Sequence, residues 1–183
     1  SFKRYINNNM KIAILGSGGR EHAIAFLLSK SKKVKKICCI PGNAGTSQVA
    51  ENVSLNLNNF ENIYKYIYKE KIDLVIVGPE EPLVNGVVDY LEKKNVNVFG
   101  PNKIASQLEG SKTFTKNLCK KYNIPTAAFG IYENKKDSLN FINNAKHPLV
   151  IKSDNLAAGK GVYICKNKEE SNLAVNEIFD GKF

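Results

Sequence analysis

A loop of small residues flanked by lysines is the part of the sequence whose chemistry is easiest to interpret. It runs from Lys152 to Val162 with the letters KSDNLAAGKGV and joins two short apolar segments. Backbone N–H groups of such a loop can fold over a triphosphate while the lysines neutralise its charge. It is not a Walker A motif, because Gly161 follows Lys160 and a strand comes next. The structural alternative is a hairpin with exposed lysines.

A second candidate site is the glycine-rich run from Gly16 to Glu21, which follows an apolar segment and opens a helical one. Glycines let the backbone approach an anion closely, and the free N–H groups at a helix start bind phosphate or carboxylate. The third glycine of a dinucleotide fingerprint is missing, and no acidic residue closes the following strand at Ile40. We therefore expect a phosphate contact and no nicotinamide cofactor, with a merely tight turn as the alternative.

Two further loops follow strand-like segments: PGNAGT at 41–46 and GPEEPL at 78–83. In a doubly wound sheet, ligands bind in the crevice outside the carboxyl ends of the strands. Small residues and hydroxyls of the first loop can bind a phosphate or an amide, and Glu80 of the second can accept hydrogen bonds from sugar hydroxyls. Each loop alone could be a turn, but three at one sheet edge predict a shared binding site.

The elements that must position these loops alternate between short apolar runs and amphipathic stretches. The expected strands are 12–15, 36–40, 53–55, 73–77 and 96–99. The expected helices between them are 20–29, 60–69 and 83–93. This alternation predicts βαβ units and an α/β fold with a Rossmann-like, doubly wound parallel sheet.

After Pro101 the pattern changes. The expected helices are 104–108, 112–121, 137–144 and one from Glu169, and the expected strands are 149–152 and 161–165. This predicts a second, smaller α+β unit with antiparallel character. The expected organisation is a disordered extension at 1–9, a Rossmann-like domain at 10–102 and a second domain at 103–183.

Composition narrows the class of partner. The chain has 183 residues, of which 43% are hydrophobic and 24% charged, which is ordinary for a globular protein. The net charge of +10 comes from scattered lysines, since arginine occurs only at Arg4 and Arg20. Nucleic-acid binders usually cluster Arg and Lys on one element. We expect a solvated lysine surface and no nucleic-acid partner, with a field that attracts anionic substrates as the alternative.

No apolar run reaches membrane-spanning length, and residues 1–9 lack the apolar core of a signal peptide. We therefore expect a cytoplasmic protein without a membrane partner. The cysteines have no metal-ligand spacing and are expected to be buried and reduced: Cys38, Cys39, Cys119 and Cys165. Neither His22 nor His147 is expected to be catalytic.

Seven ordered segments resemble the phosphoribosylamine–glycine ligase (glycinamide ribonucleotide synthetase) family of the ATP-grasp superfamily. They are 11–22, 41–46, 78–84, 100–101, 108–112, 124–126 and 152–162. The resemblance implies a Rossmann-like domain followed by an ATP-grasp module. It also implies ligation of glycine to 5-phosphoribosylamine with ATP and Mg²⁺, Mn²⁺ being the alternative metal. The resemblance further implies that glycyl phosphate forms and that the amine of phosphoribosylamine displaces phosphate to give glycinamide ribonucleotide for purine biosynthesis.

The resemblance also assigns residues. It places Lys112 and Lys152 at the ATP phosphates and forms the mobile loop above them from Ala157, Ala158, Gly159, Lys160 and Gly161. It surrounds phosphoribosylamine with Gly18, Gly19, Arg20, Glu21, Asn43, Gly45, Thr46 and Glu80, and Glu80 faces the ribose.

Two departures from the family pattern matter. Asn155 stands where glycine is usual, but asparagine tolerates the left-handed backbone, so the loop is expected to persist. The family's metal-binding glutamate and asparagine, its adenine-hinge strand and most of its glycine site fall beyond Phe183. The chain is therefore expected to be an incomplete fragment, without metal ligands and inactive alone.

Two other functions stay open. One is a different ATP-grasp ligase or carboxylase, against which the runs GGREH and NAGT argue. The other is a non-catalytic module that keeps the phosphate crevice.

Overall fold

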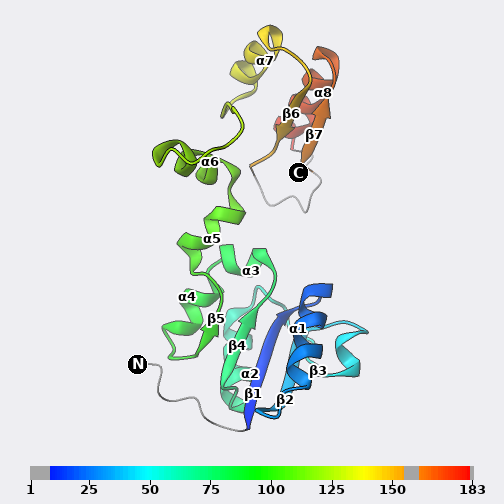
Figure 1. Cartoon of the computed structure of the whole chain (residues 1–183), viewed down its shortest axis with the longest axis vertical. Helices are drawn as coiled ribbons and strands as arrows, with labels where there is room; N and C mark the ends of the chain where they lie inside the picture. The colour runs from blue at the N-terminus through cyan, green and yellow to red at the C-terminus, as the bar shows by residue number, and fades with distance from the viewer. Residues whose placement is uncertain (1–8, 155–160, 182–183) are drawn as a thin grey trace. The chain divides into compact units, whose positions relative to one another are not determined.

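The computed structural model describes residues 9–154 and 161–181 (Figure 1). The chain divides into two compact units, residues 1–106 and residues 107–183. The expected extension at 1–9 falls almost wholly outside the described residues. So do Ala157, Ala158, Gly159 and Lys160 of the expected phosphate loop.

A five-stranded, entirely parallel sheet forms the centre of the first unit. Its strands are β1 (Met10–Gly16), β2 (Val34–Pro41), β3 (Glu51–Asn52), β4 (Leu74–Val77) and β5 (Val98–Phe99). Their order is β3-β2-β1-β4-β5, so the chain first moves outward from β1 and then returns to its other side (Figure 1). This reversal is the doubly wound arrangement that the alternation of elements predicted, and the fold class is confirmed.

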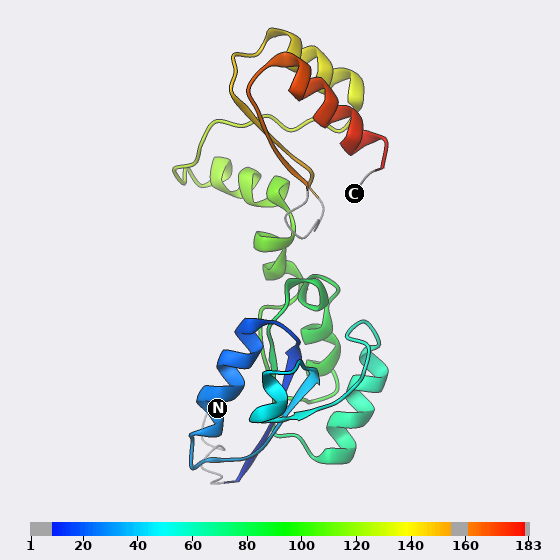
Figure 2. The ribbon, with the colours of Figure 1, turned by 90° about the vertical axis from the view of Figure 1, so that its right-hand side faces the viewer.

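Helices cover both faces of this sheet. They are α1 (Gly19–Ser29), α2 (Phe60–Glu70), α3 (Glu80–Val84) and α4 (Val87–Glu92), together with the short 3-10 helix η1 (Thr46–Gln48). Figure 2 shows α1 on one side of the sheet and α2 on the other. Because successive strand residues point to opposite faces, Ile12 and Ile14 pack with Ala25 of α1. Ala13 and Leu15 pack on the other face, with α2 and α4.

Two expected elements of the first unit differ from the structure. The helix expected over 83–93 is divided into α3 and α4, because Gly86 adopts a left-handed backbone with φ +92° between them. The strand expected at 53–55 lies instead at Glu51–Asn52, where the pairing with Cys38 and Cys39 of β2 occurs. The other expected elements of this unit occur within a few residues of their expected bounds.

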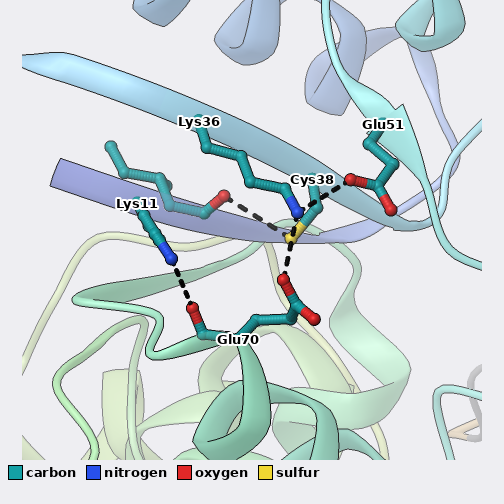
Figure 3. A network of polar contacts seen from close by, with 6 residues as sticks. Lys11, Lys36, Cys38, Glu51 and Glu70 are labelled. Atoms are coloured by element: carbon teal, nitrogen blue, oxygen red, sulfur yellow. Dashed lines mark hydrogen bonds and ion pairs between the residues drawn. The ribbon is translucent and has the colours of Figure 1, made fainter. Parts of the chain in front are cut away.

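A polar network joins β1, β2, β3 and α2 near the amino ends of the central strands (Figure 3). The ammonium of Lys36 lies between the carboxylates of Glu51, at 2.9 Å, and Glu70, at 3.1 Å. Lys11 Nζ donates to the carbonyl of Glu70 at 2.9 Å. The hydrogen bond from Lys36 holds the pKa of the Glu70 carboxyl below its ordinary value. This network fixes the end of the sheet opposite the candidate loops.

The second unit contains a two-stranded antiparallel sheet, as expected, and its last helix packs against both strands. Its elements are α5 (Lys103–Gly110), which spans the division between the units, α6 (Lys112–Lys121), α7 (Lys135–Asn144), β6 (Leu149–Lys152), β7 (Val162–Cys165) and α8 (Lys168–Phe179). Its small core includes Ile142, Cys165, Ala174 and Val175. Within the described residues, no helix is long and apolar enough to cross a membrane.

Candidate functional site

The loops after β1, β2 and β4 meet at the carboxyl edge of the first sheet. Neighbouring parallel strands end there together, with Gly16 paired to Pro41 and Leu15 paired to Val77. Backbone bonds continue past the strand ends, since Gly42 N donates to Gly16 O and Gly78 N donates to Leu15 O, both at 3.1 Å. The structure therefore brings the three predicted loops to one edge.

A pocket of about 350 Å³ opens between the loops after β1 and β4. Its lining residues are Gly16, Ser17, Gly18, Gly19, Arg20, Glu21, Leu57, Pro79 and Glu80. The predicted substrate residues Asn43, Gly45 and Thr46 belong to the neighbouring 41–46 loop and do not line it. Sequence reasoning missed Leu57, because a single apolar residue in the segment between β3 and α2 carries no chemical signal.

Arg20 and Glu80 pair with each other inside this lining. The guanidinium donates to the Glu80 carboxylate at 3.0 Å and also to the carbonyl of Gly78. A backbone N–H at Glu80 and the Arg20 guanidinium together hold the pKa of the Glu80 carboxyl below its ordinary value. Both side chains are well exposed, at 60% and 41%, and such ion pairs contribute only about 0–1 kcal/mol. A ligand can therefore replace Arg20 or Glu80 as the other's partner at a small cost in free energy.

Glu21 is enclosed by backbone and is only 4% exposed. Its Oε2 accepts a hydrogen bond from Gly18 N at 2.6 Å. A Cβ atom added to Gly78 would lie 1.9 Å from Oε1, and one added to Gly16 would lie 2.7 Å from Cδ of the same side chain. Glycine is thus required at both positions by the space that Glu21 occupies, and Gly16 also has a positive φ of +128°.

Asn43 links the 41–46 loop to the loop after β1. Its Oδ1 accepts from Gly45 N at 2.7 Å and from Thr46 N at 2.9 Å. Its Nδ2 donates to Ser17 O at 2.8 Å and to Gly18 O at 3.3 Å. The buried Thr46 hydroxyl accepts in turn from Asn43 N at 2.7 Å. These polar groups are directed at the protein itself.

Each histidine contacts a residue of its own unit. The ring of His22 packs on Gly45, where an added Cβ would lie 2.6 Å from Nδ1. His147 Nε2 lies 2.9 Å from Ser171 Oγ of α8. No group of three or more His, Cys, Asp or Glu side chains that could hold a metal ion occurs in residues 9–154 and 161–181.

In the second unit, Lys152 ends β6 with an exposed side chain. The register pairs Val150 with Ile164 and Lys152 with Val162. The alternation of strand side chains and this register place all four residues on one face of the pair. Val150, Val162 and Ile164 are exposed at 57%, 44% and 73%. This face combines an apolar surface with a positive charge.

Lys112, the other predicted phosphate ligand, is the first residue of α6. Asp154, just after β6, accepts from Ser111 Oγ at 3.0 Å and from Thr113 N at 2.8 Å. The Asp154 carboxylate therefore ties the start of α6, with Lys112, to the end of β6, with Lys152. Sequence reasoning missed Asp154. Gly161 is the residue of the predicted loop Ala157–Gly161 that the structure describes. It is buried, and its carbonyl accepts a hydrogen bond from Ser153 N at 2.8 Å.

Two family models together match residues 10–183. Residues 110–183 match the family described as phosphoribosylglycinamide synthetase, ATP-grasp (A) domain, which assigns these residues to the ATP-grasp class. Residues 10–109 match the phosphoribosylglycinamide synthetase N domain. The chain belongs to the phosphoribosylglycinamide synthetase family, and the resemblance inferred from its seven segments is confirmed.

Individual relatives agree with this assignment. The chain is 45% identical over 177 residues to phosphoribosylamine–glycine ligase of Clostridium acetobutylicum. The matched region covers 94% of this chain and 42% of that protein. The crystal structure of the Thermotoga maritima phosphoribosylamine–glycine ligase is 35% identical with a TM-score of 0.71, covering 94% and 41% of the two chains. The chain thus spans about two fifths of the length of these relatives.

A more distant neighbour shares the fold alone. It is the biotin carboxylase domain of Hydrogenobacter thermophilus 2-oxoglutarate carboxylase, at 20% identity and a TM-score of 0.71, with 93% of this chain and 41% of that chain covered. The much higher identity to the ligases favours them over the carboxylase that the sequence left open.

Proposed function

We propose that this chain provides the phosphoribosylamine crevice and part of the nucleotide site of an ATP-dependent ligase that joins glycine to 5-phosphoribosylamine. The pocket at the carboxyl edge of β1 and β4 carries this proposal. It holds the predicted residues Gly18, Gly19, Arg20, Glu21 and Glu80 in one lining. Its volume of about 350 Å³ is within the range of small-molecule sites. The names of the 45% and 35% identical relatives support the same reaction.

The pocket lining offers two kinds of polar partner. The first turn of α1 starts at Gly19, and a helix start offers amide groups without intrahelical acceptors and a partial positive charge, which suits a phosphate. Apart from Gly19 itself, its chain neighbours and the adjacent backbone of α1, no atom lies within 4 Å of a Cβ built on Gly19, so an anion can approach the backbone there. The Glu80 carboxylate is ionised at neutral pH and can accept from ribose hydroxyls. The lining therefore offers a partner for the phosphate and a partner for the ribose of a ribose 5-phosphate group.

We propose that the exposed face of β6 and β7 meets ATP. Lys152 supplies a charge for the phosphates, and Val150, Val162 and Ile164 supply an apolar surface for the base. Lys112 belongs to the same group through the Asp154 link, and Ala157–Gly161 remain the proposed cover of the phosphates. The described side chains contain no group of metal ligands that fits Mg²⁺, or Mn²⁺ in its place, so no metal-dependent step is assigned to them.

The cytoplasm is the proposed location. All four cysteines are free thiols, which suits a reducing compartment. The proposed partners are small molecules: 5-phosphoribosylamine, glycine and ATP.

Calorimetry with ribose 5-phosphate tests the crevice directly. Arg20→Ala and Glu80→Ala should each weaken binding by about tenfold, because each removes a charge-assisted contact worth roughly 1.5 kcal/mol. Lys30→Ala, at the end of α1, removes the same charge as Arg20→Ala, and Glu81→Ala is the matched control for Glu80→Ala. Equal affinity of all four variants and the unaltered chain, or no binding at all, would rule out this assignment.

A further inference from the structure

One peptide group of the crevice is held from both sides by side chains of other segments. It joins Ser17 to Gly18 in the loop after β1. Its carbonyl, Ser17 O, accepts from Asn43 Nδ2 at 2.8 Å, and its amide, Gly18 N, donates to Glu21 Oε2 at 2.6 Å. We propose that Glu21 and Asn43 are positioning residues that fix this peptide group for the ligand. We call the two hydrogen bonds to this peptide group the clamp. The effect of the clamp on ligand binding rests on the proposed function, whereas the clamp itself does not.

The peptide group needs such support because its neighbours are glycines. Gly16, Gly18 and Gly19 have no side chain to restrict the backbone, and Ser17 between them is exposed. Gly16 and Gly18 also make room for Glu21, since a Cβ on Gly18 would lie 2.9 Å from Oε2. The loop thus gains space for the buried carboxylate and loses intrinsic stiffness. The two side-chain hydrogen bonds replace the stiffness that β-carbons would give.

Asn43 has no hydrogen-bonding capacity left for a ligand. A carboxamide offers two N–H donors and two acceptor positions on its oxygen. The donors go to Ser17 O and Gly18 O, and the oxygen accepts from Gly45 N and Thr46 N. Its backbone is fixed as well, because Asn52 Nδ2 donates to Asn43 O at 2.7 Å. Asn43 therefore acts on the crevice through the carbonyl that it holds.

Glu21 acts through the amide on the other side. It is the third residue of α1, and its carboxylate caps the amide of Gly18, the residue before the helix. Bonds to an ionised acceptor are about twice as strong as neutral ones. This bond fixes where α1 begins, and with it the direction of the first-turn amides proposed to bind phosphate. Glu21 thereby sets the geometry of the anion site.

The clamp is measurable without any ligand, as hydrogen exchange of the Gly18 amide in the ¹⁵N-labelled chain. Glu21→Ala should speed this exchange by about tenfold or more, since its acceptor is gone. Asn43→Ala should speed it as well, although Asn43 does not bond that amide, because it holds the carbonyl of the same peptide group. Glu21→Gln keeps a neutral acceptor and should restore part of the protection.

Asn43→Asp gives the sharpest test. It keeps the shape of the side chain and the acceptor for Gly45 N and Thr46 N, but it sets a second carboxylate oxygen against Ser17 O and Gly18 O. Exchange of Gly18 should therefore be faster in Asn43→Asp than in Asn43→Ala. Asn62→Asp, on the exposed face of α2, adds the same charge and should change nothing. Exchange of the Val75 amide, bonded to Asn97 O in the core, reports whether a variant has lost its fold.

Ribose 5-phosphate titrations of the same variants complete the experiment. Affinity should fall in the order in which exchange of Gly18 rises. If Glu21→Gln and Asn43→Ala weaken binding but leave Gly18 exchange in the free chain unchanged, both residues touch the ligand and the positioning role is wrong. If the unaltered chain binds no ribose 5-phosphate, the proposed function fails, and the exchange pattern still decides whether the clamp exists.

Discussion

The guanidinium of Arg20 lies 3.0 Å from the carboxylate of Glu80, across 60 positions of sequence and within one pocket lining. Each of these side chains therefore influences the position and the electrostatic environment of the other. Substituting one of them alters both ends of the pair, so their effects on binding will not add.

The first prediction concerns this coupling. Arg20→Ala should raise the pKa of the Glu80 carboxyl part of the way to its ordinary value of 4.5, because the backbone N–H that also lowers it remains. A ¹³C titration of the glutamate carboxyl carbons measures the shift. Lys30→Ala serves as the control for loss of one positive charge on α1. An unchanged Glu80 pKa in Arg20→Ala would show that the pair does not persist in solution.

The second prediction concerns Gly78. Gly78→Ala should destabilise the chain by about 1–3 kcal/mol, as overpacking of a filled site does, because its Cβ would lie 1.9 Å from Glu21 Oε1. Gly19→Ala places its Cβ more than 4 Å from every atom outside the adjacent chain and helix backbone, and it should have little effect. Urea unfolding gives both values. The double variant Glu21→Ala/Gly78→Ala should be more stable than the sum of the single effects predicts, and strict additivity would contradict the proposed clash.

The third prediction is a pH dependence that arises from the Lys36 network (Figure 3). The Glu70 pKa is lower in the folded chain than its ordinary value of 4.5, mainly through the hydrogen bond from Lys36. Its contribution to stability is therefore complete above about pH 4.5 and is lost as the pH falls through the lowered pKa. Lys36→Met removes the donor, so stability should fall at neutral pH and depend less steeply on pH in acid.

Unfolding by urea from pH 7 to pH 2 checks this expectation. Lys35→Met, at an exposed neighbouring position of β2, is the matched control and should keep the acid slope. The network explanation is wrong if Lys36→Met and Lys35→Met give the same profile.

The fourth prediction concerns Lys152. In a protein that also contains the carboxyl-terminal part found in the relatives, Lys152→Met should weaken ATP binding roughly 10- to 150-fold, since one charge-assisted contact is worth about 1.5–3 kcal/mol. Methionine keeps much of the apolar stem, so the thermal midpoint should hold. Lys166→Met, also exposed and just after β7, should bind ATP normally. Equal nucleotide affinity in both variants would remove Lys152 from the site.

The sequence predicted the sheet and its loops because those follow from local pattern. Buried strands such as Leu74–Val77 are continuous apolar runs, and glycine-rich loops follow them at the edge where ligands bind. The partners of single side chains could not be predicted, since they depend on segments far apart. The resemblance predicted Glu21 and Asn43 as ligand contacts, but it could not predict their hydrogen bonds to the Ser17–Gly18 peptide. Gly86 was predicted to lie within a helix, because a single glycine in the sequence does not show where a helix is interrupted.

The position of β1 in the middle of the sheet has a consequence for synthesis of the chain. Strand β1 is made first, but one of its two neighbours, β4, begins only at Leu74. A nascent chain that has emerged as far as α2 thus has one edge of its central apolar strand unpaired, and such edges recruit other chains. Arrival of Leu74–Val77 closes that edge and, in the same step, brings Gly78 against Glu21. Aggregation of ribosome-bound chains should therefore fall once this strand has emerged.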